Sequence, residues 1–147
     1  MNIHYKKIFF FSLLVLLLIP NIIQSQQIQF FLNKEGKMLH IDVVNDYCIM
    51  ASMDSEGKLL ASNAFSMIDK INDRVKSVYY RGLTINFDFF FKRLDEISYE
   101  SYKYKFSYSF ERLAEIKGTE SIVINHSFGE IRSVSGKISG FKILVEY

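Results

Sequence analysis

The segment YKYKFSYSFERLAEI, residues 102–116, contains the pattern that most clearly indicates the fold class of this chain. Aromatic and polar side chains alternate strictly along its first nine residues. Successive side chains of a β-strand point to opposite faces, so the alternation predicts a half-buried strand with one aromatic face. That face carries Tyr102, Tyr104, Phe106, Tyr108 and Phe110. The remaining residues, ERLAEI, are predicted to return as the partner strand of a hairpin.

Related phrases recur along most of the chain. An arginine followed by an apolar residue stands at Arg74, Arg93 and Arg112, with a spacing of nineteen residues each time. Ile131–Val134 continues the series at a spacing of eighteen. Two looser copies, Glu35–Met38 and Glu56–Leu59, are twenty-one residues apart and share a glycine-basic-apolar order. The sequence therefore contains six related units.

Each unit predicts a β-hairpin, because two strands of six or seven residues plus two tight turns amount to about nineteen residues. One hairpin cannot bury its apolar face alone, so stacked neighbours must supply the core. We predict an all-β domain of tandem antiparallel hairpins that form a rolled meander or a solenoid-like sheet, with strand 141–147 covering the last open edge. Two ladders of equivalent side chains are expected: Phe91, Phe110, Phe128 and Tyr147, and Phe87, Phe106, Ile124 and Ile143.

Two features depart from this scheme. Leu94 and Ile97, like Leu113 and Ile116, are three residues apart, which places them on opposite faces of a regular strand. Either a β-bulge re-aims one residue of each pair or both faces of the sheet are covered. The segment SNAFSMIDKIND, residues 62–73, has helical spacing of apolar residues, so one helix there is the alternative to a strand.

The first 25 residues are predicted to be a signal peptide. Lys6 and Lys7 precede an apolar run over residues 8–19, Pro20 interrupts it, and Ser25 offers a small residue for cleavage. The alternative, an uncleaved anchor, is disfavoured because the run is shorter than the roughly 20 residues that span a bilayer. We expect residues 26–147 to form a single secreted or periplasmic domain without a stable membrane span.

Removal of the leader leaves a mature chain that is formally neutral. Of 18 Lys and Arg residues, Lys6 and Lys7 leave with the leader, and the remaining 16 balance 16 Asp and Glu. No basic block remains to follow a phosphate backbone, so nucleic acid is not an expected partner, and attraction to anionic membranes lacks electrostatic support. The single cysteine, Cys48, precludes an internal disulfide; a buried inert thiol is favoured over an intermolecular bridge or a reactive thiol.

The order Phe87-Asp88, with Gly57-Lys58-Leu59 and Arg93-Leu94, resembles the tyrosine-aspartate (YD, or Rhs-type) hairpin repeats. It is also similar to short repeats in many small exported proteins of Bacteroidota. The pattern is degenerate, since Asp88 becomes Ser107 and Asn125 in later units. The resemblance implies a β-rich surface protein that acts as a scaffold or binding module, with no catalytic residue to carry over. Six units are too few for the cargo-enclosing shells of the larger members.

No residue pattern points to catalysis, a metal or a cofactor. His40 and Asp42 form an H-x-D pair, which is too few ligands for a metal site. His126 occupies an aromatic position and is expected to be packed or at an edge. Residues 125–127 form a glycosylation sequon, and the alternation places Asn125 outward. Asp95 and Glu96 are adjacent and would face opposite sides of a regular strand, so they are not expected to flank one glycosidic bond.

The predicted contact surface is the outward side of the hairpins. It comprises Tyr79, Tyr80, Tyr99, Lys103 and Lys105, and exposed tyrosines beside polar residues suit contacts with a cell-envelope glycan or a protein. The alternative is that these tyrosines cover a second apolar layer. We expect a non-catalytic binding or structural module at the cell envelope, able to oligomerise through its sheet edges. The other hypothesis is a small secreted hydrolase or hydrolase inhibitor that uses carboxylates brought together by the fold.

Overall fold

The computed structural model of the chain describes residues 27–44, 49–62, 67–71, 74–80, 82–88 and 90–147. The predicted signal peptide and Cys48 lie outside these residues. All regular elements in the described ranges are strands, which confirms the prediction of an all-β fold. None of the described residues belongs to a helix long and apolar enough to cross a membrane.

Thirteen strands follow one another in the described ranges. They are β1 (Gln27–Asn33), β2 (Met38–Val44), β3 (Ile49–Asp54), β4 (Leu59–Ser62), β5 (Met67–Ile71), β6 (Arg74–Tyr80), β7 (Leu83–Asp88), β8 (Arg93–Tyr99), β9 (Tyr102–Ser109), β10 (Arg112–Lys117), β11 (Ser121–Ser127), β12 (Glu130–Gly136) and β13 (Phe141–Glu146). The alternative of a helix over residues 62–73 is wrong where this segment is described, because Met67–Ile71 pairs with β6 as a strand, while residues 63–66 and 72–73 lie outside the described residues. Cross-strand pairing overrides the helical spacing of its apolar residues.

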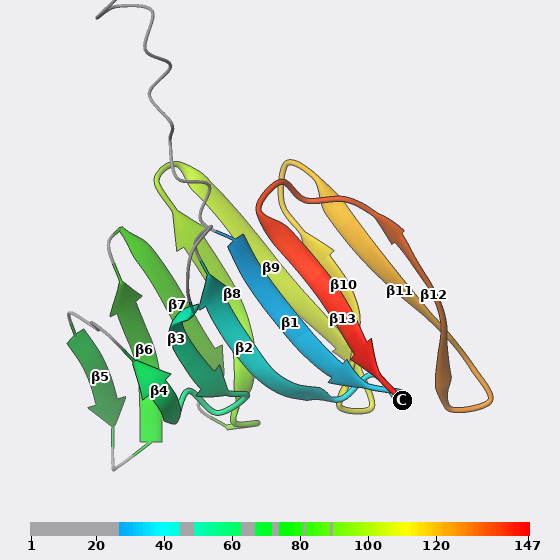
Figure 1. The fold of residues 1–147 in the computed structure, drawn as a ribbon, viewed down its shortest axis with the longest axis horizontal. Coiled ribbons are helices and arrows are strands. Elements are labelled where there is room, and N and C mark those ends of the chain that lie inside the picture. Colours follow the sequence, from blue (N-terminus) through cyan, green and yellow to red (C-terminus); the bar gives the residue numbers. More distant parts are fainter. Residues whose placement is uncertain (1–26, 45–48, 63–66, 72–73, 81, 89) are drawn as a thin grey trace, which may run out of the picture.

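The strands form two sheets, which are stacked face to face (Figure 1). Strands β5 to β12 make an eight-stranded antiparallel meander, and the order β13-β1-β2-β3-β4 makes the five-stranded sheet. Aromatic rings join the sheets: the ring centroids of Phe30 and Phe106 are 5.3 Å apart, and those of Tyr104 and Phe141 are 4.8 Å apart. The six predicted hairpins therefore share a single core between the two sheets.

The sequence predicted that the last strand covers the open edge of the meander, and this prediction is wrong. β13 crosses to the other sheet and pairs in parallel with β1, with Ile28 opposite Phe141 and Leu32 opposite Val145. Burial decides this placement, because β13 brings Phe141 beside Phe30, with 5.4 Å between ring centroids. β12 consequently remains an edge strand, and it extends beyond β13 in Figure 1.

A β-bulge near the start of each even-numbered strand explains the three-residue apolar spacing. In β10, Leu113 pairs with Tyr108 and Glu115 with Ser107, so Ala114 is an extra residue. Leu113 and Ile116 consequently both point into the core, and both are 0 % exposed. The extra residues are Leu39, Leu60, Lys76, Asp95, Ala114 and Arg132. Of the two alternatives left open by the sequence, the bulge is the one that occurs.

The turns within the hairpins are of two kinds, and the difference shifts the repeat alignment. Asn33 Oδ1 and Asp54 Oδ1 each accept backbone N–H groups two and four residues further on, so the two looser units have equivalent turns. Asp88 begins a turn of this longer kind, whereas residues 109–112 and 127–130 form two-residue turns. As a result Phe87, which the expected ladder aligned with Phe106, is the counterpart of Tyr108 and His126, since each pairs with the residue before a bulge.

Polar side chains at the position shared by Tyr108 and His126 connect consecutive hairpins. The Tyr108 hydroxyl donates to the Leu94 carbonyl at 2.6 Å, and His126 Nε2 lies 2.9 Å from the Leu113 carbonyl. The carbonyl can only accept, so Nε2 is the protonated nitrogen of His126. Leu94 and Leu113 are themselves equivalent, each standing just before a bulge. His126 is thus a packed histidine that bonds to the neighbouring hairpin.

Replacement of Tyr108 by Phe tests this bridge. Loss of the donor should cost about 1–2 kcal/mol of unfolding free energy, because the Leu94 carbonyl loses its side-chain partner. Burial raises the pKa of the Tyr108 hydroxyl, against the opposing effect of Arg93. The unfolded chain releases this proton near pH 10 while the folded chain keeps it, so the folded state loses stability as the pH rises above about 10. Denaturant titrations from pH 7 to 11 should show a shallower alkaline decline for Tyr108→Phe; equal declines would contradict the proposed burial.

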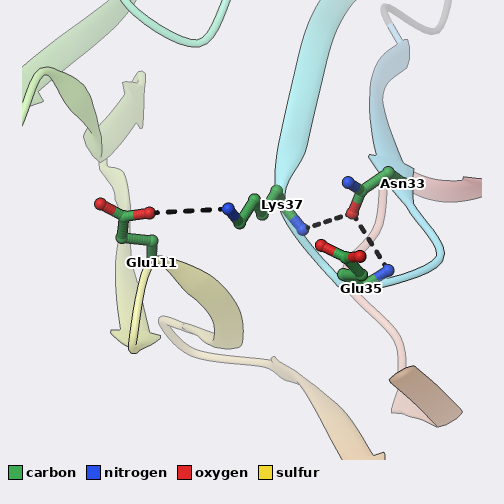
Figure 2. Close-up of polar contacts among 4 residues, drawn as sticks. All are labelled: Asn33, Glu35, Lys37 and Glu111. Carbon is green, nitrogen blue, oxygen red and sulfur yellow. Dashed lines mark hydrogen bonds and ion pairs between the residues drawn. The ribbon is translucent and has the colours of Figure 1, made fainter. Parts of the chain in front are cut away.

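The first hairpin turn holds the two sheets together at one end. Its carbonyls accept from the far sheet: Leu113 N–H donates to Gly36 O at 2.9 Å and Ile131 N–H to Lys34 O at 2.8 Å. Figure 2 shows how Asn33 shapes this turn and how Lys37 reaches Glu111, with 3.8 Å between Nζ and Oε2. We call residues 33–38 the clamp turn, because they connect the N-terminal hairpin to β10 and β12.

Candidate functional site

Four aromatic residues that were expected to form a core ladder instead lie on the surface. Phe91 is 68 % exposed, Phe110 94 %, Phe128 106 % and Tyr147 96 %. The prediction was wrong because Phe110 and Phe128 belong to turns rather than to the strands before them. With Phe90, at 82 %, these are the large apolar side chains that are more than 60 % exposed among the described residues. Of the second expected ladder, Phe87, Phe106 and Ile124 are buried, but Phe87 is out of line with Phe106 because it is the counterpart of Tyr108, and Ile143 lies half-buried in the other sheet.

The topology gathers all five at one end of the molecule, which we call the turn end. Strands β7, β9 and β11 run in the same direction, so the turns that follow them lie at the same end of the sheet. The clamp turn bonds to the second residues of β10 and β12, Leu113 and Ile131, and Glu146 pairs with Asn33, so the C-terminal Tyr147 lies there as well. In Figure 1 these turns and the C-terminus lie along the lower side.

The backbone at two of these positions is strained. Phe110 and Glu111 have φ angles of 49° and 65°, and Phe128 and Gly129 have 52° and 85°. Positive φ at both central residues defines a type I′ turn, which favours Asn-Gly and is unfavourable for a bulky side chain. Neither phenylalanine gains burial in return. Residues held in an unfavourable backbone region without a packing gain are candidates for function.

Charged groups surround the rings, and the glutamates among them are paired with groups of opposite charge. Lys34 Nζ lies 3.1 Å from Glu130 Oε1, and Lys37 reaches Glu111, so each acidic residue at these two tips has a lysine partner from the clamp turn. The Arg93 guanidinium lies over the Phe91 ring at 4.7 Å and over the Tyr108 ring at 4.3 Å. The two glutamates beside Phe110 and Phe128 are therefore neutralised by lysines of the clamp turn.

The five residues of the predicted contact surface do not form one patch. Tyr79, Lys103 and Lys105 lie on the outer face of the eight-stranded sheet, where Tyr79 and Lys103 share a cross-strand row through Thr84 and Ser98. Tyr99 and the strand position of Tyr80 instead align with the buried Leu83, on the core-facing side at the opposite end of the strands.

The remaining polar candidates are also dispersed. His40 stacks on Phe31 with 4.1 Å between ring centroids, and its Nε2 is 3.9 Å from Asp42 Oδ1, on the outer face of the five-stranded sheet. His126 lies in the other sheet. Asn125 is exposed, as predicted, and its amide donates to Ser133 Oγ at 3.2 Å. No group of three or more His, Cys, Asp or Glu side chains that could hold a metal ion occurs within the described ranges.

One expectation about the carboxylates needs correction. Asp95 and Glu96 were placed on opposite faces by assuming a regular strand. Because Asp95 is the bulged residue of β8 and both Leu94 and Ile97 are 0 % exposed, the two acidic residues between them lie on the solvent side together. Glu96 Oε1 accepts from Ser98 Oγ at 3.2 Å. Both carboxylates are half-buried surface groups.

Comparisons with known proteins identify no relative of this chain. No family model matches the chain, and no curated protein or solved structure matches it at a significant level.

A signal for the turn end was present in the sequence. Phe128 precedes a glycine, and a Phe-Gly pair between two alternating segments fits a two-residue turn. Two other turns have the same spacing, since Phe91 stands three residues before Leu94 and Phe110 three residues before Leu113. The strict alternation that continues through Phe110 concealed this, because it makes the turn residue look like the next core residue.

Proposed function

We propose that the protein is an exported, non-catalytic binding module of the cell envelope and that the turn end is its contact surface. The observation that carries this proposal is the pair Phe110 and Phe128, which occupy positive-φ turn positions with nearly full exposure. Exposed apolar clusters of this kind mark interaction sites in soluble domains. The resemblance to YD-type repeats, whose members serve as scaffolds and binding modules, agrees with this assignment.

Retention on cell-envelope fractions tests the proposal. The double variant Phe110→Asn/Phe128→Asn should reduce retention of the mature chain at least tenfold, which corresponds to about 1.4 kcal/mol, because two rings no longer bury apolar area against the partner. The matched control, Lys103→Gln/Lys105→Gln, alters the outer face of the sheet and should leave retention unchanged. Equal retention of the double variant and the unaltered chain would contradict the assignment of the surface, and release of soluble envelope fragments would show an enzyme instead.

A further inference from the structure

We infer that the turn end binds a lipid surface of neutral headgroups, into which the phenylalanine tips insert. The inference rests on the proposed function and names the partner of the same site. It concerns peripheral contact through side chains of the turns, not a segment that spans the bilayer.

The spacing of the tips favours an extended surface over a small ligand. Phe110 and Phe128 occupy the turns of neighbouring hairpins, and Phe91 occupies the turn on the other side of Phe110. Equivalent turns of a meander are two strands apart, which is roughly 10 Å. A small ligand therefore reaches one ring, whereas a continuous surface meets the rings of three hairpins at once.

The exposure of the rings favours insertion over stacking. At 94 % and 106 % exposed, the side chains of Phe110 and Phe128 project from the turns with both ring faces free. A stacking platform presents one face and packs the other against the protein. A ring that is free on both sides gains most from complete removal from water, as in the interfacial layer of a bilayer.

Part of the backbone at the turn end is hydrogen-bonded within the protein. Asp88 Oδ1 accepts from Phe90 N–H at 2.9 Å and from Phe91 N–H at 3.1 Å, and Asp88 O accepts from Lys92 N–H at 2.9 Å. The two-residue turns are closed by the pairs Ser109–Arg112 and Ser127–Glu130. Groups that are bonded within the protein lose little when water is excluded, which is the requirement for contact with lipid.

The charges select among lipids. Glu111 and Glu130 are each paired with a lysine of the clamp turn, and the mature chain is formally neutral. Such a surface is not attracted to anionic headgroups by its charge, and no charge repulsion opposes its contact with neutral headgroups. Insertion into zwitterionic lipid should therefore depend on the rings and only weakly on salt.

The chain contains no tryptophan, so a single substitution creates a probe of insertion. Phe128→Trp should show a blue-shifted fluorescence maximum on addition of phosphatidylcholine vesicles, at both 0.1 M and 0.5 M NaCl. Val123→Trp, which is on the outer face of β11, is the matched control and should show no shift. A probe at 128 that is unaffected by phosphatidylcholine, or that responds only to anionic vesicles at low salt, would overturn the inference.

Vesicle flotation with the Asn variants separates this inference from the proposed function. Phe110→Asn/Phe128→Asn should lower the fraction that floats with phosphatidylcholine vesicles at least tenfold, and circular dichroism should show that the variant is folded. If the same variant loses retention on envelope fractions while the unaltered chain ignores the vesicles, the binding surface stands and the partner is a glycan or a protein. If retention and flotation are both insensitive to the rings, the proposed function and the inference fail together.

Discussion

Replacement of Gly36 by Ala should destabilise the fold by about 2–5 kcal/mol. Gly36 has a φ of 84°, where a side chain costs about 1–2 kcal/mol. A Cβ there would also overlap the imidazole of His126, and overpacking costs about 1–3 kcal/mol more. The clash would push the clamp turn away from β10 and weaken the bond from Leu113 N–H to Gly36 O. Urea unfolding followed by circular dichroism measures the loss.

Gly82→Ala is the matched control for this prediction. Gly82 has a φ of 80°, but nothing lies within 4 Å of a Cβ built there. Its replacement should cost only the conformational part, about 1–2 kcal/mol. Adding His126→Ala to Gly36→Ala should recover part of the loss, because the ring that meets the new methyl group is gone. Equal losses at Gly36 and Gly82 would show that the clamp turn does not pack against His126.

Leu113→Ala and Ile116→Ala should each cost about 2–5 kcal/mol. Both side chains are fully buried, since the bulge at Ala114 turns them to the same face of β10. In a regular strand, residues three apart face opposite sides, and only one of the two substitutions would then be severe. Chemical denaturation of both variants distinguishes the two arrangements.

Ala114→Ser provides the control for the bulge. The extra residue is half-buried on the solvent side, so a small polar substitution should change the unfolding free energy by less than about 0.5 kcal/mol. A mild effect at Ile116 together with a severe one at Leu113 would contradict the bulged geometry.

The repeat and its alternation were readable from the sequence, because period-two patterning is a local property of each strand. Alternation in residues 102–109 and the common position of Gly36 and Gly57 correctly predicted strands and equivalent turns. The crossing of β13 to pair with β1 was not predictable in this way. It depends on Phe141 packing against Phe30 and Tyr104, which are more than 30 positions away in the sequence.

The candidate site was not predicted because it depends on where strands stop. Element boundaries are the weakest part of a pattern-based assignment, since a turn residue can continue the alternation of the strand before it. Phe110 follows Tyr108 at the expected interval, yet β9 ends at Ser109. A shift of one residue at this boundary moves a phenylalanine from the expected core to a turn position where it is 94 % exposed. Lys103 and Lys105, which lie within β9 and before its end, are exposed on the outer face of the sheet.

Stability and binding can be measured together on one protein, the double variant Phe110→Asn/Phe128→Asn. Asparagine tolerates positive φ and creates an Asn-Gly turn at 128–129, so the midpoint of thermal unfolding should rise by a few degrees, in keeping with a gain on the order of 1 kcal/mol. Retention on envelope fractions should fall at least tenfold in the same preparation. A variant that unfolds at a lower temperature than the unaltered chain, or that binds as well, would contradict the claim that these rings serve contact rather than folding.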